Sequence, residues 1–143
     1  MTAAADLSRL GGRIAFVSGA AGHLGRPMAR VLCEAGAHVI LNGRSDAKLK
    51  EFEAVLRGEG HSVERATFDV SDFPRAREFM ASRPRLDILV NNAISMTPAP
   101  FAALTPEAFD QTYRSSVTAA FELVRAALPA LRAAVAASGE ASI

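Results

Sequence analysis

A chain of 143 residues, half of them hydrophobic, is long enough for one domain with its own core, expected to span residues 1–143. Sixteen basic and fifteen acidic residues nearly cancel, which argues against nucleic acid or an anionic membrane as a partner. No stretch approaches the roughly 18 consecutive apolar residues of a membrane span, and residues 1–13 lack the apolar run of a signal peptide. With Cys33 as the only cysteine, these features predict a protein of the reducing cytoplasm.

Four short runs of strand-like composition alternate with segments of helical periodicity. The first, second and fourth are largely apolar, as expected for strands covered on both faces, whereas the third alternates and should lie toward an edge. Alternating strands and helices imply right-handed crossovers and a single parallel sheet. The sequence therefore predicts an α/β fold with a doubly wound parallel sheet. The predicted strands are residues 13–18, 38–42, 63–68 and 86–91.

The intervening segments have apolar residues three or four positions apart, as in helices that bury one face. Asp72 and Thr105 suit helix N-caps, with Pro74 and Pro106 in the first turns. Pro129 should kink the last helix or end its regular hydrogen bonding. The stripes expected to be buried are Leu24, Met28, Val31, Leu32 and Ala35; Leu49, Phe52, Val55 and Leu56; Ala76, Phe79 and Met80; and Phe109, Tyr113, Val117, Phe121, Val124, Leu128, Leu131 and Val135.

A glycine-rich turn follows the first predicted strand and leads straight into a helix. It reads Ser18-Gly19-Ala20-Ala21-Gly22-His23-Leu24-Gly25. Glycines allow a sharp turn and let backbone amides approach a pyrophosphate without an intervening side chain. The free amides and partial positive charge at the start of the helix favour phosphate. Because this turn lies between a first strand and a first helix, it indicates a dinucleotide site.

This segment resembles the Thr-Gly-x-x-x-Gly-x-Gly motif of the short-chain dehydrogenases/reductases. Ser18 takes the threonine position, and His23 stands in place of the middle glycine. Asn42-Gly43-Arg44, Asp69-Val70 and Asn91-Asn92-Ala93-Ile94 match further segments of that family in the same order. The resemblance runs from about Leu10 to the last residue. It implies a Rossmann-like doubly wound sheet and the N-terminal cofactor-binding part of an oxidoreductase that transfers hydride between a nicotinamide dinucleotide and a carbonyl or secondary alcohol.

The resemblance also implies roles for individual residues. NAD-selective members commonly place a carboxylate at the position of Gly43; here none stands there, and Arg44 can pair with a 2′-phosphate. The expected cofactor is therefore NADP, with NAD as the second choice; the alternative for Arg44 is an ordinary solvated loop cation. Asp69 is expected to accept a hydrogen bond from the adenine amino group, beside the backbone of Val70. The expected cofactor-binding residues are Ser18, Gly19, Gly22, His23, Leu24, Gly25, Arg44, Asp69, Val70, Asn91 and Ala93.

No catalytic residue is expected within these 143 residues. In the family, a serine after the fifth strand and a Tyr-x-x-x-Lys pair carry the proton chemistry. Here the only tyrosine, Tyr113, is followed four positions later by Val117, and it is interpreted as a packing residue. Ser116 holds the position of a catalytic asparagine and is interpreted as a small polar residue on a packed helix face. Cys33 is expected to be a core thiol, and the three histidines lack metal-ligand spacing.

Residues 139–143 resemble the run into a fifth strand, so we expect a sheet truncated after its fourth strand and the long helix that follows. A strand edge and an apolar helix face would then lack partners, which predicts marginal stability and self-association. The leading interpretation is a fragment of an NADP-dependent oxidoreductase, inactive alone, whose full-length parent acts on a small carbonyl or alcohol. The alternatives are a non-catalytic dinucleotide-binding or interaction module and a chain without a ligand.

Overall fold

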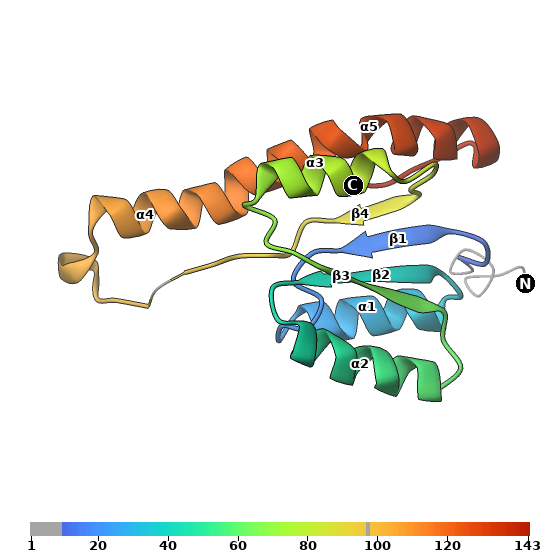
Figure 1. The fold of residues 1–143 in the computed structure, drawn as a ribbon, viewed down its shortest axis with the longest axis horizontal. Helices are drawn as coiled ribbons and strands as arrows, with labels where there is room; N and C mark the ends of the chain where they lie inside the picture. Colours follow the sequence, from blue (N-terminus) through green and yellow to red (C-terminus); the bar gives the residue numbers. More distant parts are fainter. Residues whose placement is uncertain (1–9, 97) are drawn as a thin grey trace, which may run out of the picture.

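The computed structural model describes residues 10–96 and 98–143 (Figure 1). The expectation that residues 1–13 form no signal peptide therefore falls mostly outside the described residues. Among the helices of the described chain, none combines the length and the apolar character that crossing a membrane requires.

Four strands form one parallel sheet: β1 (Ile14–Val17), β2 (His38–Gly43), β3 (Val63–Thr67) and β4 (Ile88–Val90). Their order across the sheet is β3-β2-β1-β4. The predicted strands and the doubly wound parallel sheet are confirmed, and β3 lies at an edge as its alternating pattern indicated. The winding reverses between β1 and β4, which is where sheets of this kind open a crevice beyond the carboxyl ends of their strands.

Helices cover both faces of this sheet (Figure 1). One face carries α1 (Gly25–Glu34) and α2 (Asp46–Gly58), and the other carries α3 (Phe73–Ala81) and α5 (Ala119–Ser138). The helix caps expected from the sequence are confirmed, since the Asp72 carboxylate accepts a hydrogen bond from the Arg75 amide at 3.2 Å. These two helical layers enclose one hydrophobic core on each side of the sheet.

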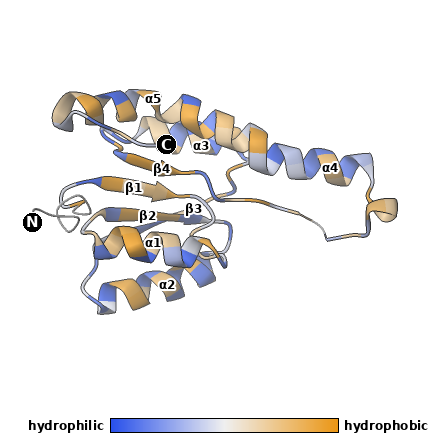
Figure 2. Ribbon diagram, turned by 180° about the vertical axis from the view of Figure 1, so that it is seen from behind, coloured by the Kyte–Doolittle hydropathy of each residue, from blue (hydrophilic) through white to orange (hydrophobic). Residues whose placement is uncertain are grey.

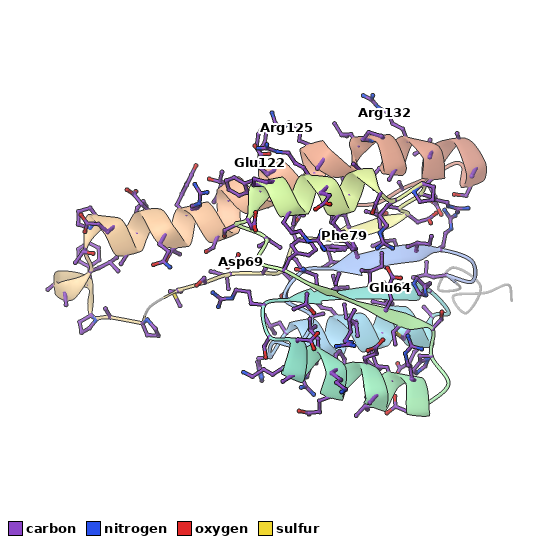
Figure 3. The ribbon with its side chains drawn as sticks, viewed as in Figure 1. Glu64, Asp69, Phe79, Glu122, Arg125 and Arg132 are labelled. Carbon is purple, nitrogen blue, oxygen red and sulfur yellow. The ribbon has the colours of Figure 1, made fainter. Side chains whose placement is uncertain are left out.

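The two cores follow from the alternation of side chains along each strand. In β1, Phe16 points toward α3 and α5, whereas Val17 points toward α1 and α2. Phe16 lies with Phe68 and Phe79 in an aromatic cluster whose closest ring centroids are 5.2 Å apart. Figure 3 labels Phe79 between α3 and the sheet, and Figure 2 shows the hydrophobic colouring gathered in the strands.

The buried face of α1 differs from the predicted stripe. Leu24 and Val31 are 60% and 62% exposed, and Met28 is 40% exposed, so the expectation that these large side chains face the core is wrong. Small residues let the helix approach the sheet and the glycine turn closely, and this close approach determines which face is buried. Burial raises the pKa of the Cys33 thiol to about 11, which agrees with the expected core thiol. The buried residues of α1 are Gly25, Ala29 and Cys33.

In α2 the predicted stripe is confirmed except at one position. Leu49, Phe52 and Leu56 are buried against the sheet, whereas Val55 is 43% exposed. Val55 is one residue from Leu56, which turns it about a quarter of the way around the helix from the buried face. The periodicity therefore identified the helix correctly and assigned one residue too many to its buried side.

The long helical segment after β4 is divided into parts. A short 3₁₀ turn, η1 (Phe101–Ala103), precedes α4 (Pro106–Tyr113), and a π-helical segment, η2 (Arg114–Thr118), joins α4 to α5. Thr105 caps α4 as expected, accepting a hydrogen bond from the Ala108 amide at 3.2 Å. Helix α5 continues past Pro129 to Ser138, so Pro129 lies inside the helix. Pro129 is exposed, and the carbonyl that it leaves without a helical partner can bind water.

The predicted stripe of the long segment is mostly exposed. Phe109, Tyr113, Val117 and Phe121 are between 49% and 61% exposed, so their predicted burial is wrong within the described chain. Tyr113 stacks only on Phe109, with ring centroids 6.4 Å apart. Helix α4 extends beyond the carboxyl ends of the strands, so its side chains have no sheet to pack against (Figure 1). The buried face of α5 consists instead of Ala119, Glu122, Leu123, Ala127, Ala130, Leu131 and Ala134.

The final residues extend the sheet beyond β4 by one bridge. Ser142 pairs in parallel with Ile88: the Leu89 amide donates to the Ser142 carbonyl at 3.0 Å, and the Ser142 amide donates to the Asp87 carbonyl at 2.9 Å. The expected run toward a fifth strand is confirmed at this position.

The Asp87 carboxylate joins the start of β1 to β4. It is 1% exposed and accepts hydrogen bonds from the Ile14 amide at 2.9 Å, from Arg13 at 3.1 Å and from Arg85 at 2.6 Å. Arg13 in turn donates to the Glu140 carboxylate at 2.9 Å. The buried Asp87 carboxylate therefore holds the amino end of β1 in place. Through Arg13 it also holds the last residues of the chain.

Candidate functional site

A cavity of about 530 Å³ opens at the carboxyl ends of the strands, where the winding of the sheet reverses. Residues that follow each of the four strands contribute to its walls, which brings together motifs far apart in the sequence. Of the predicted binding residues, those that line it are Gly19, Gly22, His23, Leu24, Arg44, Asp69, Val70 and Ala93.

The glycine turn forms the floor of this cavity. Gly19 has a φ of +66°, a left-handed conformation that favours glycine, and a β-carbon at Gly25 would lie 2.1 Å from the Gly19 carbonyl oxygen. The turn is thus closed tightly against the first turn of α1. Within residues 10–96 and 98–143, the amides of His23 and Leu24 donate to no other group, and no side chain caps the helix. These amides are free to bind a ligand.

Ser18 lies beneath the cavity wall, and its hydroxyl is already bonded within the chain. Its Oγ accepts hydrogen bonds from the amides of Asn92 at 2.9 Å and Ala93 at 3.0 Å, and it lies 3.1 Å from the Val90 carbonyl, to which it can donate. The Asn92 side chain donates to the carbonyls of Ser18 at 2.9 Å and Gly19 at 3.2 Å. These bonds hold the exit of β4 against the glycine turn.

Asn92 lines the main cavity, whereas Asn91 lines only a small hollow beside it. The sequence reasoning chose Asn91 and omitted Asn92, although the two are neighbours in the same motif. Strand alternation was the available signal, because adjacent residues at the end of a strand point to opposite sides.

The opposite wall is built by the ends of β2 and β3. Asn42 is 1% exposed, and its side-chain amide donates to the carbonyls of Ala66 at 2.8 Å and Phe68 at 3.1 Å. The Asp69 carboxylate accepts a hydrogen bond from the Ser71 amide at 2.8 Å, and Arg44 lies 3.8 Å from it. Figure 3 places Asp69 where the chain leaves β3. The wall thus carries one fixed anion and one exposed cation.

Lys48 and Ser45 also line this end of the cavity. Lys48 is exposed, and it faces the cavity from the first turn of α2. Its position beside Arg44 becomes apparent only once β2 and α2 are folded together. Two cations therefore lie at this end of the site.

The π-helical segment contributes a residue that the sequence reasoning missed. Ser115 is buried and lines the main cavity; its Oγ accepts a hydrogen bond from the Ser95 amide at 3.0 Å and lies 3.1 Å from the Ser95 carbonyl. Ser116, assigned to the position of the family's asparagine, lies only at the small hollow and donates to the Thr112 carbonyl at 2.6 Å. Ser115, not Ser116, holds the loop after β4.

A tight glycine turn with free helix amides, set at the reversal point of a parallel sheet, defines a Rossmann-type nucleotide-binding protein. Comparison with known proteins narrows this class to one family. The chain belongs to the short-chain dehydrogenases, because a sequence profile described as short chain dehydrogenase matches residues 13–141.

Individual relatives agree with this membership. L-xylulose reductase of Mesocricetus auratus is 34% identical over 114 residues, covering 80% of this chain and 45% of that protein. Gluconate 5-dehydrogenase of Gluconobacter oxydans (strain 621H) is 33% identical over 120 residues, covering 81% and 47%. The chain spans about half the length of the curated relatives it matches, and it corresponds to the N-terminal, cofactor-binding part of the family.

Solved structures give the same result. The crystal structure of a gluconate 5-dehydrogenase from Burkholderia cenocepacia J2315 in complex with NADP and tartrate matches with a TM-score of 0.76 and 33% identity, covering 91% of this chain and 51% of that one. The Pseudomonas aeruginosa RhlG/NADP active-site complex matches with a TM-score of 0.80 and 30% identity, covering 87% and 50%.

Proposed function

We propose that this chain binds a nicotinamide dinucleotide, with NADP preferred over NAD. The observation that carries the proposal is the glycine turn, whose free His23 and Leu24 amides face a cavity large enough for a cofactor. The absence of space for a β-carbon at Gly25 fits a turn shaped for a diphosphate. The two cations at the other end, Arg44 and Lys48, fit an additional phosphate.

A titration of the purified chain with NADPH and NADH, followed by cofactor fluorescence, tests this proposal. Saturable binding of both is expected, with the tighter binding for NADPH. Circular dichroism on the same sample establishes that the chain is folded. A folded chain that takes up neither cofactor would end the proposal.

Arg44→Ala is expected to weaken NADP⁺ binding by about tenfold or more, because a hydrogen-bonded charge pair is worth about 1.5–3 kcal/mol. NAD⁺ binding should change by less than about twofold, since NAD⁺ lacks the 2′-phosphate that Arg44 would hold. Calorimetric titration of both cofactors measures the two effects. Arg132→Ala, an exposed arginine on α5 far from the cavity (Figure 3), serves as the control. Equal losses for the two cofactors would contradict the role of Arg44.

We further propose that this site serves hydride transfer between NADP and a carbonyl or secondary alcohol. Sharing this family with L-xylulose reductase and the gluconate 5-dehydrogenases supports that reaction class. The bound dinucleotide supplies the hydride, and the residues of this chain hold it and shape the loop after β4 through Ser115. Because Tyr113 is the only tyrosine and Val117 follows it four positions later, the 143 residues by themselves are expected to bind cofactor without reducing a carbonyl.

We also propose that the chain associates with itself through the exposed apolar face of α4 and α5. This face is made of Phe109, Tyr113, Val117, Phe121 and Leu128, which are 37–61% exposed. Large apolar side chains exposed repeatedly along one helical segment commonly mark an interaction site.

Phe121→Arg is expected to raise the dissociation constant for self-association by at least about tenfold, because a charge would then occupy the centre of the apolar face. Sedimentation velocity across a concentration series measures the change. Val31→Arg is the matched control, since Val31 is equally exposed but lies on α1, on the opposite side of the sheet. A wild-type chain that stays monomeric at micromolar concentration would contradict the proposal.

A further inference from the structure

Arg44 and Asp69 face each other at one end of the cavity. They directly follow the last paired residues of two neighbouring strands, since Gly43 pairs with Thr67 and the Phe68 amide donates to the Gly43 carbonyl at 3.1 Å. The Arg44 guanidinium lies 3.8 Å from the Asp69 carboxylate, and both side chains line the cavity. Any ligand group that reaches Arg44 therefore also approaches Asp69.

The carboxylate is held in place, whereas the guanidinium is not. One oxygen of Asp69 accepts the Ser71 amide at 2.8 Å, which leaves the other oxygen toward Arg44. The buried Asn42 amide bonds to the carbonyl of Phe68, the residue before Asp69, and so fixes the position from which Asp69 projects. Arg44 is 63% exposed, and Asp69 is its only ionic partner among the described residues. A carboxylate held by a backbone hydrogen bond thus faces a long, exposed cation.

We infer that Asp69 sets the preference between NADP and NAD by opposing the 2′-phosphate, and that Arg44 offsets this opposition. The inference rests on the proposed function, because it concerns the same adenosine end of the site. A 2′-phosphate bound by Arg44 would lie close to the fixed Asp69 carboxylate, and like charges at short range repel. Arg44 has five donors and can neutralise both anions at once. Without Arg44, the carboxylate repels the phosphate unopposed.

The charge and the hydrogen bond of Asp69 can be separated by substitution. Asp69→Asn keeps the oxygen that accepts the Ser71 amide, but it removes the negative charge and puts an NH2 group in place of the oxygen that faces Arg44. Asp69→Ala removes both the charge and the acceptor. Both variants should therefore shift the choice between the cofactors, because both remove the charge, whereas the loss of an acceptor should affect both cofactors alike.

Calorimetric titration of NADP⁺ and NAD⁺ into wild type, Asp69→Asn, Arg44→Ala and the double variant tests the inference. Asp69→Asn should raise the NADP⁺/NAD⁺ affinity ratio by about two- to fivefold, the range measured for exposed ion pairs. The gain should be larger in the Arg44→Ala background, and it should shrink as salt is added. Adenosine 2′,5′-bisphosphate and 5′-AMP should reproduce the same contrast without the nicotinamide half.

The outcomes separate this inference from the proposed function. If Asp69→Asn and Asp69→Ala both leave the NADP⁺/NAD⁺ affinity ratio unchanged, Asp69 is only a hydrogen-bond acceptor and the inference is wrong, while cofactor binding stands. If the folded wild-type chain binds neither dinucleotide, both proposals fail together. Thermal melting of each variant separates a loss of folding from a loss of binding.

Discussion

Gly25→Ala is expected to abolish measurable binding of the dinucleotide. The added β-carbon would lie 2.1 Å from the Gly19 carbonyl oxygen and 2.8 Å from the Ala20 Cα, so the turn and the start of α1 must separate. Both contacts are with backbone atoms, which cannot rotate away. Overpacking of this severity costs at least about 3 kcal/mol, and the displacement moves the amides that face the cavity. Fluorescence titration with NADPH, together with a denaturant unfolding curve, measures both consequences.

Two further glycines make this test quantitative. A β-carbon at Gly22 would lie 3.1 Å from the Gly19 carbonyl oxygen, so Gly22→Ala should weaken binding by a smaller factor. Gly58, in α2, has nothing within 4 Å of the corresponding position, and Gly58→Ala should stabilise the fold by about 0.4–1 kcal/mol. If Gly25→Ala bound NADPH as well as Gly58→Ala does, the tight closure of the turn would not matter for binding.

Asp87→Asn is expected to lower the free energy of unfolding by about 3 kcal/mol, because breaking a buried charge pair leaves its partners uncompensated. Asp87 is 1% exposed and accepts hydrogen bonds from Arg13, Arg85 and the Ile14 amide. Urea unfolding at neutral pH measures the loss. Glu140→Gln is the control: Glu140 also pairs with Arg13, but its side chain is 78% exposed, so it should cost less than about 1 kcal/mol.

The same carboxylate predicts how stability depends on pH. Burial alone would raise the pKa of Asp87, but hydrogen bonds from Arg85, the Ile14 amide and Arg13 outweigh it and hold that pKa below its ordinary value. A depressed pKa means that the stabilisation is fully present above the pKa of the unfolded chain and is lost as pH falls through the lower folded value. The difference in stability between wild type and Asp87→Asn should therefore shrink in acid. A difference that stayed constant with pH would contradict this account.

Local patterns in the sequence predicted most of the elements. The strands, the caps at Asp72 and Thr105, and the glycine turn each depend on residues that are neighbours along the chain. Placing β3 at an edge also succeeded, because the alternation in residues 63–68 reports a strand that is less completely covered. The end of the cavity formed by the glycine turn follows from this local information.

The errors in the predicted buried faces of α1 and α5 share one physical cause. Periodicity shows that a segment is a helix, but it does not show which of two non-polar faces is pressed against the sheet. In α1 the small face of Ala29 and Cys33 allows the closer approach and is buried in place of Leu24 and Val31. In the long segment, the alanine-rich side of α5 packs onto the sheet, which leaves Phe121 in solvent.

The sequence by itself determined that this chain forms a doubly wound parallel sheet with a glycine turn between its first strand and first helix, since strand patterns and tight turns are properties of short segments. Only the tertiary structure decided which side chains meet at the cavity: Asn92 rather than Asn91, Ser115 rather than Ser116, and Arg44 opposite Asp69. Asn92 bonds to Ser18, Ser115 bonds to Ser95, and Arg44 faces Asp69, so the partners are 20 to 74 positions apart in the sequence. These pairings depend on how the ends of separate strands are set side by side, and that arrangement arises from packing across the whole sheet.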